Sequence, residues 1–102
     1  MAKQDSNLEV ATAEEWFVLS LTEICSSFNI SKSFIVEIID EGIVSVDKEK
    51  EEDWRFDSHA LQRIKIVMHL TKDLGINMAG AGLAIDLLQE IERLEGLLNK
   101  TY

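Results

Sequence analysis

The C-terminal quarter of the chain, residues 77 to 102, constrains the fold more than any other segment. It contains no proline, and its apolar residues recur at alternating three- and four-residue steps, which is the spacing of one helical face. We therefore predict a helix over residues 78 to 100 that begins after Asn77. Its apolar face consists of Ala84, Leu87, Ile91, Leu94 and Leu98.

Two heptads are too few for a stable isolated coiled coil, so this apolar face needs a surface to cover it. Packing into the chain's own core and pairing with a second copy both meet that need, and the sequence leaves both open. Because the face lies at the end of the chain, beyond the compact unit, we predict dimerisation through these five residues.

Two short helices are predicted in the first half of the chain. Thr22 suits the N-cap of a helix over residues 23 to 28, and Ser31 suits the N-cap of the next helix. Gly42 ends that second helix, because glycine readily adopts the left-handed conformation of a C-terminal cap. The second helix has a helical repeat of apolar residues at Phe34, Ile35, Ile38 and Ile39. Together the two helices form a helix-turn-helix.

A third helix is predicted over residues 58 to 74, with Asp57 as its N-cap and Gly75 at its end. Its expected inward residues are Leu61, Ile64, Met68 and Leu74.

Short strands complete the predicted fold. Residues 16 to 21, "WFVLSL", are apolar and partly β-branched. Residues 43 to 46, "IVSV", and 54 to 56, "WRF", are further strand candidates, and the charged "DKEKEED" between them predicts a hairpin, the wing. The expected fold class is thus mainly α, a winged helix-turn-helix with a small β-hairpin wing and a long C-terminal helix.

We expect a flexible lead-in over residues 1 to 15, a winged helix-turn-helix with its third helix over 16 to 76, and the C-terminal helix over 77 to 102. A chain of 102 residues has room for one modest core. No apolar run approaches the roughly 20 residues that a membrane helix requires, and the first residues do not resemble a secretory signal. We therefore expect a cytoplasmic protein without membrane contact.

The charge of the chain bears on its partners. Ten Lys and Arg oppose nineteen Asp and Glu, a formal charge of −9. Between residues 32 and 56 there are four cationic side chains and eight acidic ones, so the second helix and the wing are net acidic. Affinity for nucleic acid depends on cations that displace counterions from phosphates. This distribution disfavours DNA and favours a basic protein partner.

Reactive and metal-binding residues are sparse. The single Cys25 and the two histidines, His59 and His69, have no metal-ligand spacing, and no nucleophile motif or phosphate-binding loop is present. The "GAG" at residues 80 to 82 lacks the rest of a dinucleotide fingerprint and favours close helix packing or a loose first turn. We predict no enzyme activity, no metal and no cofactor.

Four ordered segments carry a family resemblance: "LTEICSSFNIS", "IIDEGIV", "WRFDSHAL" and "LTKDLGINMAGAGLAIDLLQEIERLEGLL". In this order they resemble the MerR-type winged helix-turn-helix, and more closely its chaperone-modulator branch, the CbpM family, over about residues 17 to 100. The most specific positions are Trp54, Phe56, Asp57, His59, Ala60, Leu74, Gly80, Ala84 and Ile91. DNA-reading MerR proteins carry an arginine followed by aromatic residues in the second helix, where this chain has "FIVEIIDEG".

The resemblance implies a dimeric modulator, without catalysis, that binds the J-domain of the DnaJ-like co-chaperone CbpA. In that family the bound modulator prevents the J-domain from stimulating DnaK and antagonises the co-chaperone's DNA binding. J-domains present a basic second helix to DnaK, and an acidic surface could cover it. From charge and position, our candidates for partner contact are Phe34 and Ile35 with Glu37, Asp40, Glu41, Glu49, Glu51, Glu52 and Asp53.

Two other functions remain open at this point. A MerR-like DNA-binding transcription regulator is suggested by the fold, although Lys32 is the only cation of the second helix. An adaptor for an unrelated basic protein would also fit the charge.

Overall fold

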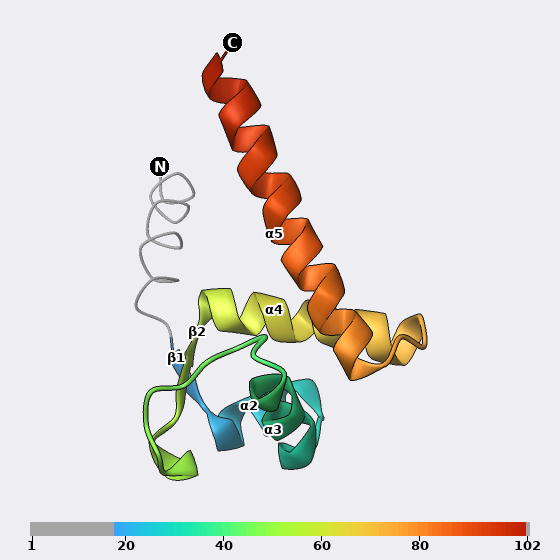
Figure 1. Cartoon of the computed structure of the whole chain (residues 1–102). Coiled ribbons are helices and arrows are strands. Elements are labelled where there is room, and N and C mark those ends of the chain that lie inside the picture. Colours follow the sequence, from blue (N-terminus) through green and yellow to red (C-terminus); the bar gives the residue numbers. More distant parts are fainter. Residues whose placement is uncertain (1–17, 102) are drawn as a thin grey trace, which may run out of the picture.

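The computed structural model describes residues 18 to 101 and shows a predominantly helical chain with one small sheet, which confirms the expected fold class (Figure 1). The expected lead-in over residues 1 to 15 lies outside the described residues. The elements in chain order are β1 (Val18–Ser20), α2 (Leu21–Phe28), α3 (Lys32–Asp40), η1 (Glu51–Asp53), β2 (Arg55–Asp57), α4 (Ser58–Met68), η2 (His69–Asp73) and α5 (Met78–Thr101).

The sheet joins strands that are far apart in the chain. β1 and β2 run antiparallel, with Leu19 opposite Phe56. The predicted strand over residues 16 to 21 is therefore present at Val18–Ser20, while residues 16 and 17 lie outside the described part. The predicted pairing of residues 43 to 46 with 54 to 56 is wrong, because residues 43 to 46 form no strand. Ile43 and Val44 are adjacent and both buried, whereas a half-buried strand alternates.

The first helix begins earlier than the sequence predicted. The N-cap is Ser20, not Thr22, and α2 starts at Leu21. The side chain of Ser20 accepts a hydrogen bond from the backbone N–H of Glu23 at 3.2 Å, and Glu23 accepts one from the backbone N–H of Ser20 at 2.8 Å. This reciprocal capping box satisfies two N–H groups that the helix itself leaves unpaired. The start at residue 21 also places Leu21 in the core.

The second helix has the predicted ends. Ser31 accepts a hydrogen bond from the backbone N–H of Phe34, and Gly42 has a left-handed φ of 78°. The N–H of Gly42 donates to the carbonyl of Ile39 at 2.9 Å, and that of Ile43 donates to the carbonyl of Ile38 at 3.1 Å. These two bonds form a Schellman motif, which turns the chain back toward the core at Ile43.

Replacing Gly42 by alanine should lower the free energy of unfolding by about 1 kcal/mol, because a Cβ disfavours the left-handed conformation. The matched control is Gly96→Ala in α5, where a Cβ would meet no atom within 4 Å. That change should raise stability by roughly 0.5–1 kcal/mol, since alanine is the better helix former. Urea unfolding of both variants would contradict this account if the two effects had the same sign.

The third predicted helix is present, but its last part is a π-helix and not an α-helix. Asp57 caps α4 by accepting from the backbone N–H of Ala60 at 2.9 Å. From His69 to Asp73 the chain forms a wider π-helical turn, in which the N–H of Leu74 donates to the carbonyl of His69. Gly75, with a φ of 72°, then ends the segment as predicted.

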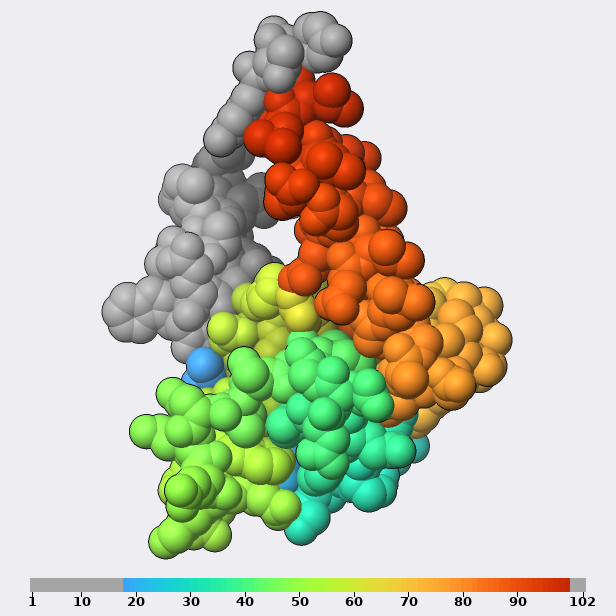
Figure 2. All heavy atoms as spheres, in the orientation of Figure 1, coloured from blue at the N-terminus to red at the C-terminus, as the bar shows by residue number. Residues whose placement is uncertain are grey.

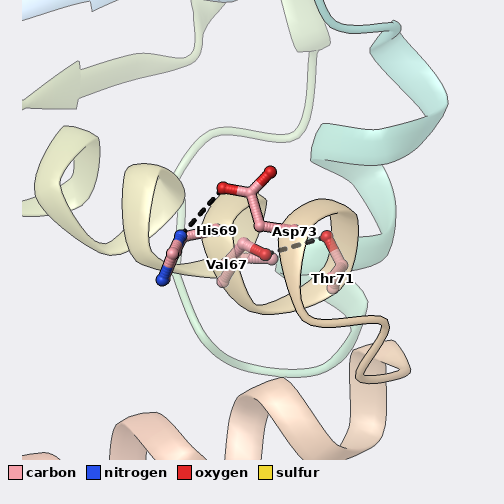
Figure 3. Close-up of polar contacts among 4 residues, drawn as sticks. All are labelled: Val67, His69, Thr71 and Asp73. Atoms are coloured by element: carbon pink, nitrogen blue, oxygen red, sulfur yellow. Dashed lines mark hydrogen bonds and ion pairs between the residues drawn. The ribbon is translucent and has the colours of Figure 1, made fainter.

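Side chains support this wider turn (Figure 3). The hydroxyl of Thr71 donates to the carbonyl of Val67 at 2.8 Å, and Nδ1 of His69 lies 2.9 Å from Oδ2 of Asp73. Of the four residues expected on the inward side, Leu61 and Ile64 are buried and Met68 is half-buried, but Leu74 is exposed. The prediction for Leu74 is wrong because the π turn rotates it away from the core.

The core lies between the helix-turn-helix, the sheet, α4 and the start of α5. α4 lies across the α2–α3 pair. α5 starts beside α4 and then runs away from the rest of the molecule (Figure 1). Among residues 18 to 101, no helix is both long enough and apolar enough to span a bilayer. The buried residues are Leu21, Ile24, Ile30, Ile35, Ile38, Ile43, Val44, Trp54, Phe56, Leu61, Ile64, Val67, Ala81 and Ile85.

The start of α5 packs closely on the body. Asn77 caps it as predicted, since its side chain accepts a hydrogen bond from the N–H of Gly80 at 2.8 Å. Ala81 is fully buried, and a Cβ on Gly82 would lie 3.5 Å from Ile43. The burial of Ala81 confirms the expectation of close helix packing, while a Cβ on Gly82 would make only an ordinary van der Waals contact with Ile43.

Candidate functional site

One side of α3 packs into the core, and the side that faces solvent is acidic. Ile35 and Ile38 are completely buried. Glu37 and Asp40 lie on the side of the helix away from them, Glu41 is the C-cap residue, and all three are exposed. The end of α3 therefore presents three carboxylates to solvent.

The loop after α3 adds four more acidic candidates. Residues 41 to 54, termed the 41–54 loop, lie beside α3 in the lower part of the molecule (Figure 2). Glu49, Glu52 and Asp53 are exposed, and Glu51 is half-buried. We define the acidic face as Glu37, Asp40, Glu41, Glu49, Glu51, Glu52 and Asp53.

Side chains of the body hold the 41–54 loop although it forms no hairpin. Nη1 of Arg63 on α4 donates to the carbonyl of Ile43 at 2.7 Å. The indole N–H of Trp54 donates to the carbonyl of Lys48 at 2.9 Å. Ile43, Val44 and Trp54 are buried, so both ends of the loop are anchored in the core. Its charged middle is consequently fixed at the surface.

One ion pair connects the acidic face to the start of α3. Nζ of Lys32 lies 2.8 Å from Oε1 of Glu51 in η1, and both side chains are partly exposed to solvent. The hydrogen bond that Glu51 accepts raises the pKa of Lys32 above its ordinary value, and the charge of Glu51 adds to the effect. The ammonium is therefore fully charged at neutral pH. The part of the stabilisation that depends on the charge of Lys32 is therefore lost as the pH rises through that raised pKa.

The two apolar candidates for partner contact differ in their surroundings. Ile35 is 0% exposed and belongs to the core, so it offers no surface to a partner. This prediction is corrected: the periodicity placed both residues in one helix but did not decide which of them borders the surface. Phe34 is half-buried, and Nζ of Lys72 lies 5.1 Å from its ring centroid. Phe34 remains the apolar candidate beside the acidic face.

The predicted dimerisation residues lie along α5 after it leaves the body. Leu87, Ile91, Leu94 and Leu98 are 46% to 57% exposed, and we term them the α5 stripe. Ala84, the fifth predicted residue, is half-buried close to the body. The buried side of α5 is formed instead by Ala81 and Ile85. The stripe is thus not part of the core that residues 18 to 101 form, and dimerisation through it remains a prediction.

Titratable residues outside the acidic face form no reactive arrangement in the part of the chain that the structure describes. No three His, Cys, Asp or Glu side chains among residues 18 to 101 converge as metal ligands. Cys25 is a half-buried free thiol next to the core. A shallow groove between α4 and α5 is bordered by His59, Arg63 and Leu88.

Two kinds of contact were not foreseen from the sequence. One is the pairing of Lys32 with Glu51, and the other is the position of Lys65 and Lys72 over the rings of Phe28 and Phe34. The sequence did contain a signal for the first contact. A lysine at the first position of a helix is disfavoured by the helix dipole, so an acidic partner elsewhere in the chain is expected. The second depends on how α4, which carries Lys65, and η2, which carries Lys72, pack on the helix-turn-helix, and local spacing does not reveal this.

Comparison with known proteins places this geometry in a family. Residues 19 to 101 match the family described as MerR HTH family regulatory protein. A chaperone modulatory protein CbpM of Coxiella burnetii is 32% identical over 77 residues, which cover 76% of this chain and 73% of the relative. CbpM proteins of Pseudomonas entomophila and Pseudomonas putida are 30% and 32% identical, over 74% of this chain and 75% of each relative. The chain therefore belongs to the CbpM family of MerR-type helix-turn-helix proteins.

Proposed function

We propose that this protein is a cytoplasmic chaperone modulator that binds the J-domain of a DnaJ-like co-chaperone of the CbpA type. In this proposal the bound protein inhibits stimulation of DnaK by the J-domain and carries out no catalysis. The observation that carries the proposal is the acidic face, which lies on α3 and the anchored 41–54 loop of a helix-turn-helix scaffold. The names of the CbpM relatives support the chaperone role.

The proposed mechanism is competition for one surface. A basic J-domain helix would be attracted by the carboxylates of the acidic face, which raises the rate of encounter. The half-buried ring of Phe34 would supply apolar contact at the edge of the face. While the J-domain helix is covered, DnaK cannot reach it. This scheme requires neither a cofactor nor a bond-making step.

We also propose that the protein acts as a homodimer that pairs through the α5 stripe. Four large aliphatic side chains on one side of one helix form a continuous apolar surface, which is uncommon on a monomer. A second copy of α5 would present the same spacing and could interdigitate with it.

Charge reversal on the 41–54 loop tests the proposed J-domain contact. Glu49→Lys/Glu52→Lys should weaken binding to the J-domain of the organism's own CbpA-like protein by about tenfold or more, close to 1.4 kcal/mol. Both side chains are exposed, so the fold should persist. The measurement is fluorescence anisotropy with labelled J-domain at low and at high salt.

The control is Asp86→Lys/Glu92→Lys on α5, which changes the net charge by the same amount away from the acidic face. It should reduce the affinity far less. Equal losses in the two variants would contradict the assignment of the acidic face. A wild-type protein that binds no J-domain of its organism would contradict the function itself.

A MerR-like DNA-binding regulator is the alternative function, and the family match is the observation that favours it. The acidic face opposes it, since a reading helix needs cations around it to neutralise phosphates. A gel shift with genomic fragments at low salt separates the two functions. A sequence-specific complex, together with no J-domain binding, would favour the regulator.

A further inference from the structure

Lys32 occupies an unusual place for a lysine. It is the first residue of α3, where the helix dipole disfavours a positive charge, and the first turn of α3 contains no acidic residue to offset it. Its side chain instead reaches a residue 19 positions later, with Nζ 2.8 Å from Oε1 of Glu51. A lysine at this position does not stabilise α3 itself. Its interaction is instead with Glu51 of the acidic face.

The surroundings of the pair are open. Lys32 and Glu51 border a groove together with Ser20, Leu21, Thr22 and Glu52. The side chains of Lys32 and Glu51 are 61% and 44% exposed, so water and an incoming group both have access. A partner's lysine or arginine could take the same carboxylate at little steric cost. The ammonium of Lys32 thus occupies the position beside Glu51 that a cation of a partner could take.

We propose that Lys32 is an internal competitor, which occupies Glu51 and thereby lowers the affinity of the acidic face for a basic helix. This inference rests on the proposed function for its biological meaning. Docking of the partner releases Lys32 into solvent and transfers Glu51 to a cation of the partner. The affinity of wild type is consequently below what its acidic face can provide.

A purely structural role for Lys32 predicts the opposite result. If the ion pair served only to brace η1 against α3, its removal would loosen the 41–54 loop and weaken binding. Competition predicts tighter binding on removal of the ammonium. The sign of the change therefore distinguishes the two roles.

The test compares Lys32→Met with Lys50→Met. Both variants lose one positive charge from the same unit, but Lys50 takes part in no ion pair within 4.0 Å among the described residues. Two probes are used: the J-domain named above, and a synthetic helical peptide with Lys and Arg at every third or fourth position. We expect Lys32→Met to bind each probe roughly three- to fivefold more tightly at low salt, and Lys50→Met less than about twofold.

A double-mutant cycle with Glu51→Gln completes the test. In wild type, Glu51→Gln should cost less affinity than in the Lys32→Met background, because the lost contact with the partner's cation is offset in part by the contact with Lys32 that no longer has to be broken. In the Lys32→Met background it should remove the gain. Circular dichroism and urea unfolding of each variant verify that the fold is retained.

The outcomes separate the inference from the proposed function. Equal effects of Lys32→Met and Lys50→Met, or weaker binding by Lys32→Met, would overturn the competitor role. A gain that persists in the presence of Glu51→Gln would also overturn it, because the gain would then not pass through Glu51. If the peptide shows the expected pattern but no J-domain binds, the inference stands and the proposed partner is wrong.

Discussion

Replacing Phe56 by alanine is expected to lower the free energy of unfolding by about 3–5 kcal/mol, a large part of the total for a domain of this size. Phe56 is 1% exposed, lies opposite Leu19 in the sheet and meets Trp54 edge to face, with ring centroids 6.4 Å apart. Its removal should leave a cavity in the core beside β1 and α4, the neighbours of β2. Trp54, which anchors the end of the 41–54 loop, loses its aromatic neighbour in the same step.

Phe28→Ala is the matched control for this prediction. Phe28 is half-buried under Lys65, whose Nζ lies 5.9 Å from the ring centroid. Its loss should cost only about 1–2 kcal/mol. Urea unfolding of both variants at one protomer concentration gives the comparison, because stability depends on concentration if the protein dimerises. A cost for Phe56→Ala no larger than that for Phe28→Ala would contradict the described core.

Substituting the α5 stripe is expected to abolish self-association. Ile91→Lys/Leu94→Lys places two charges on each copy of the apolar surface, so a symmetric pair would contain four. The lost burial alone should exceed about 3 kcal/mol, which weakens the dimer more than roughly 100-fold. Analytical ultracentrifugation over a range of concentrations should find a monomer, with the helical content of the body retained.

The control for the stripe keeps the added charge and the helix. Gln89→Lys/Asn99→Lys adds the same two charges to the side of α5 away from the stripe, where both side chains are exposed. This variant should associate like wild type. Dissociation of both variants would indicate a general charge effect, and a wild type that is monomeric at high concentration would refute the proposed dimer.

The helix ends were predictable from the sequence because their causes are local. Ser31, Asp57 and Asn77 each cap a helix through a bond to a backbone N–H three residues away, and Gly42 has the positive φ expected after a helix. The start of α2 was misplaced by two residues because both Ser20 and Thr22 can cap. Glu23, three residues after Ser20, was the local signal that decides between them.

The strand pairing was less predictable because it depends on which distant segment packs beside β2 in the folded chain. Residues 43 to 46 have a β-like composition, yet the Schellman turn at Gly42 sends Ile43 and Val44 into the core side by side. β1 supplies the partner strand.

The candidate site was also only partly predictable from the sequence. Charge alone identified the acidic face, but the burial of Ile35 and the contact of Lys32 with Glu51 follow from tertiary packing.

The most direct test of the central claim is the ATPase rate of DnaK stimulated by the J-domain of the CbpA-like co-chaperone. Titration with wild-type protein should return the rate to the basal rate of DnaK, while Glu49→Lys/Glu52→Lys should require a much higher concentration. Without the J-domain, neither protein should change the rate. Full stimulation that persists at a concentration of wild type saturating the J-domain would contradict the proposed mechanism of competition.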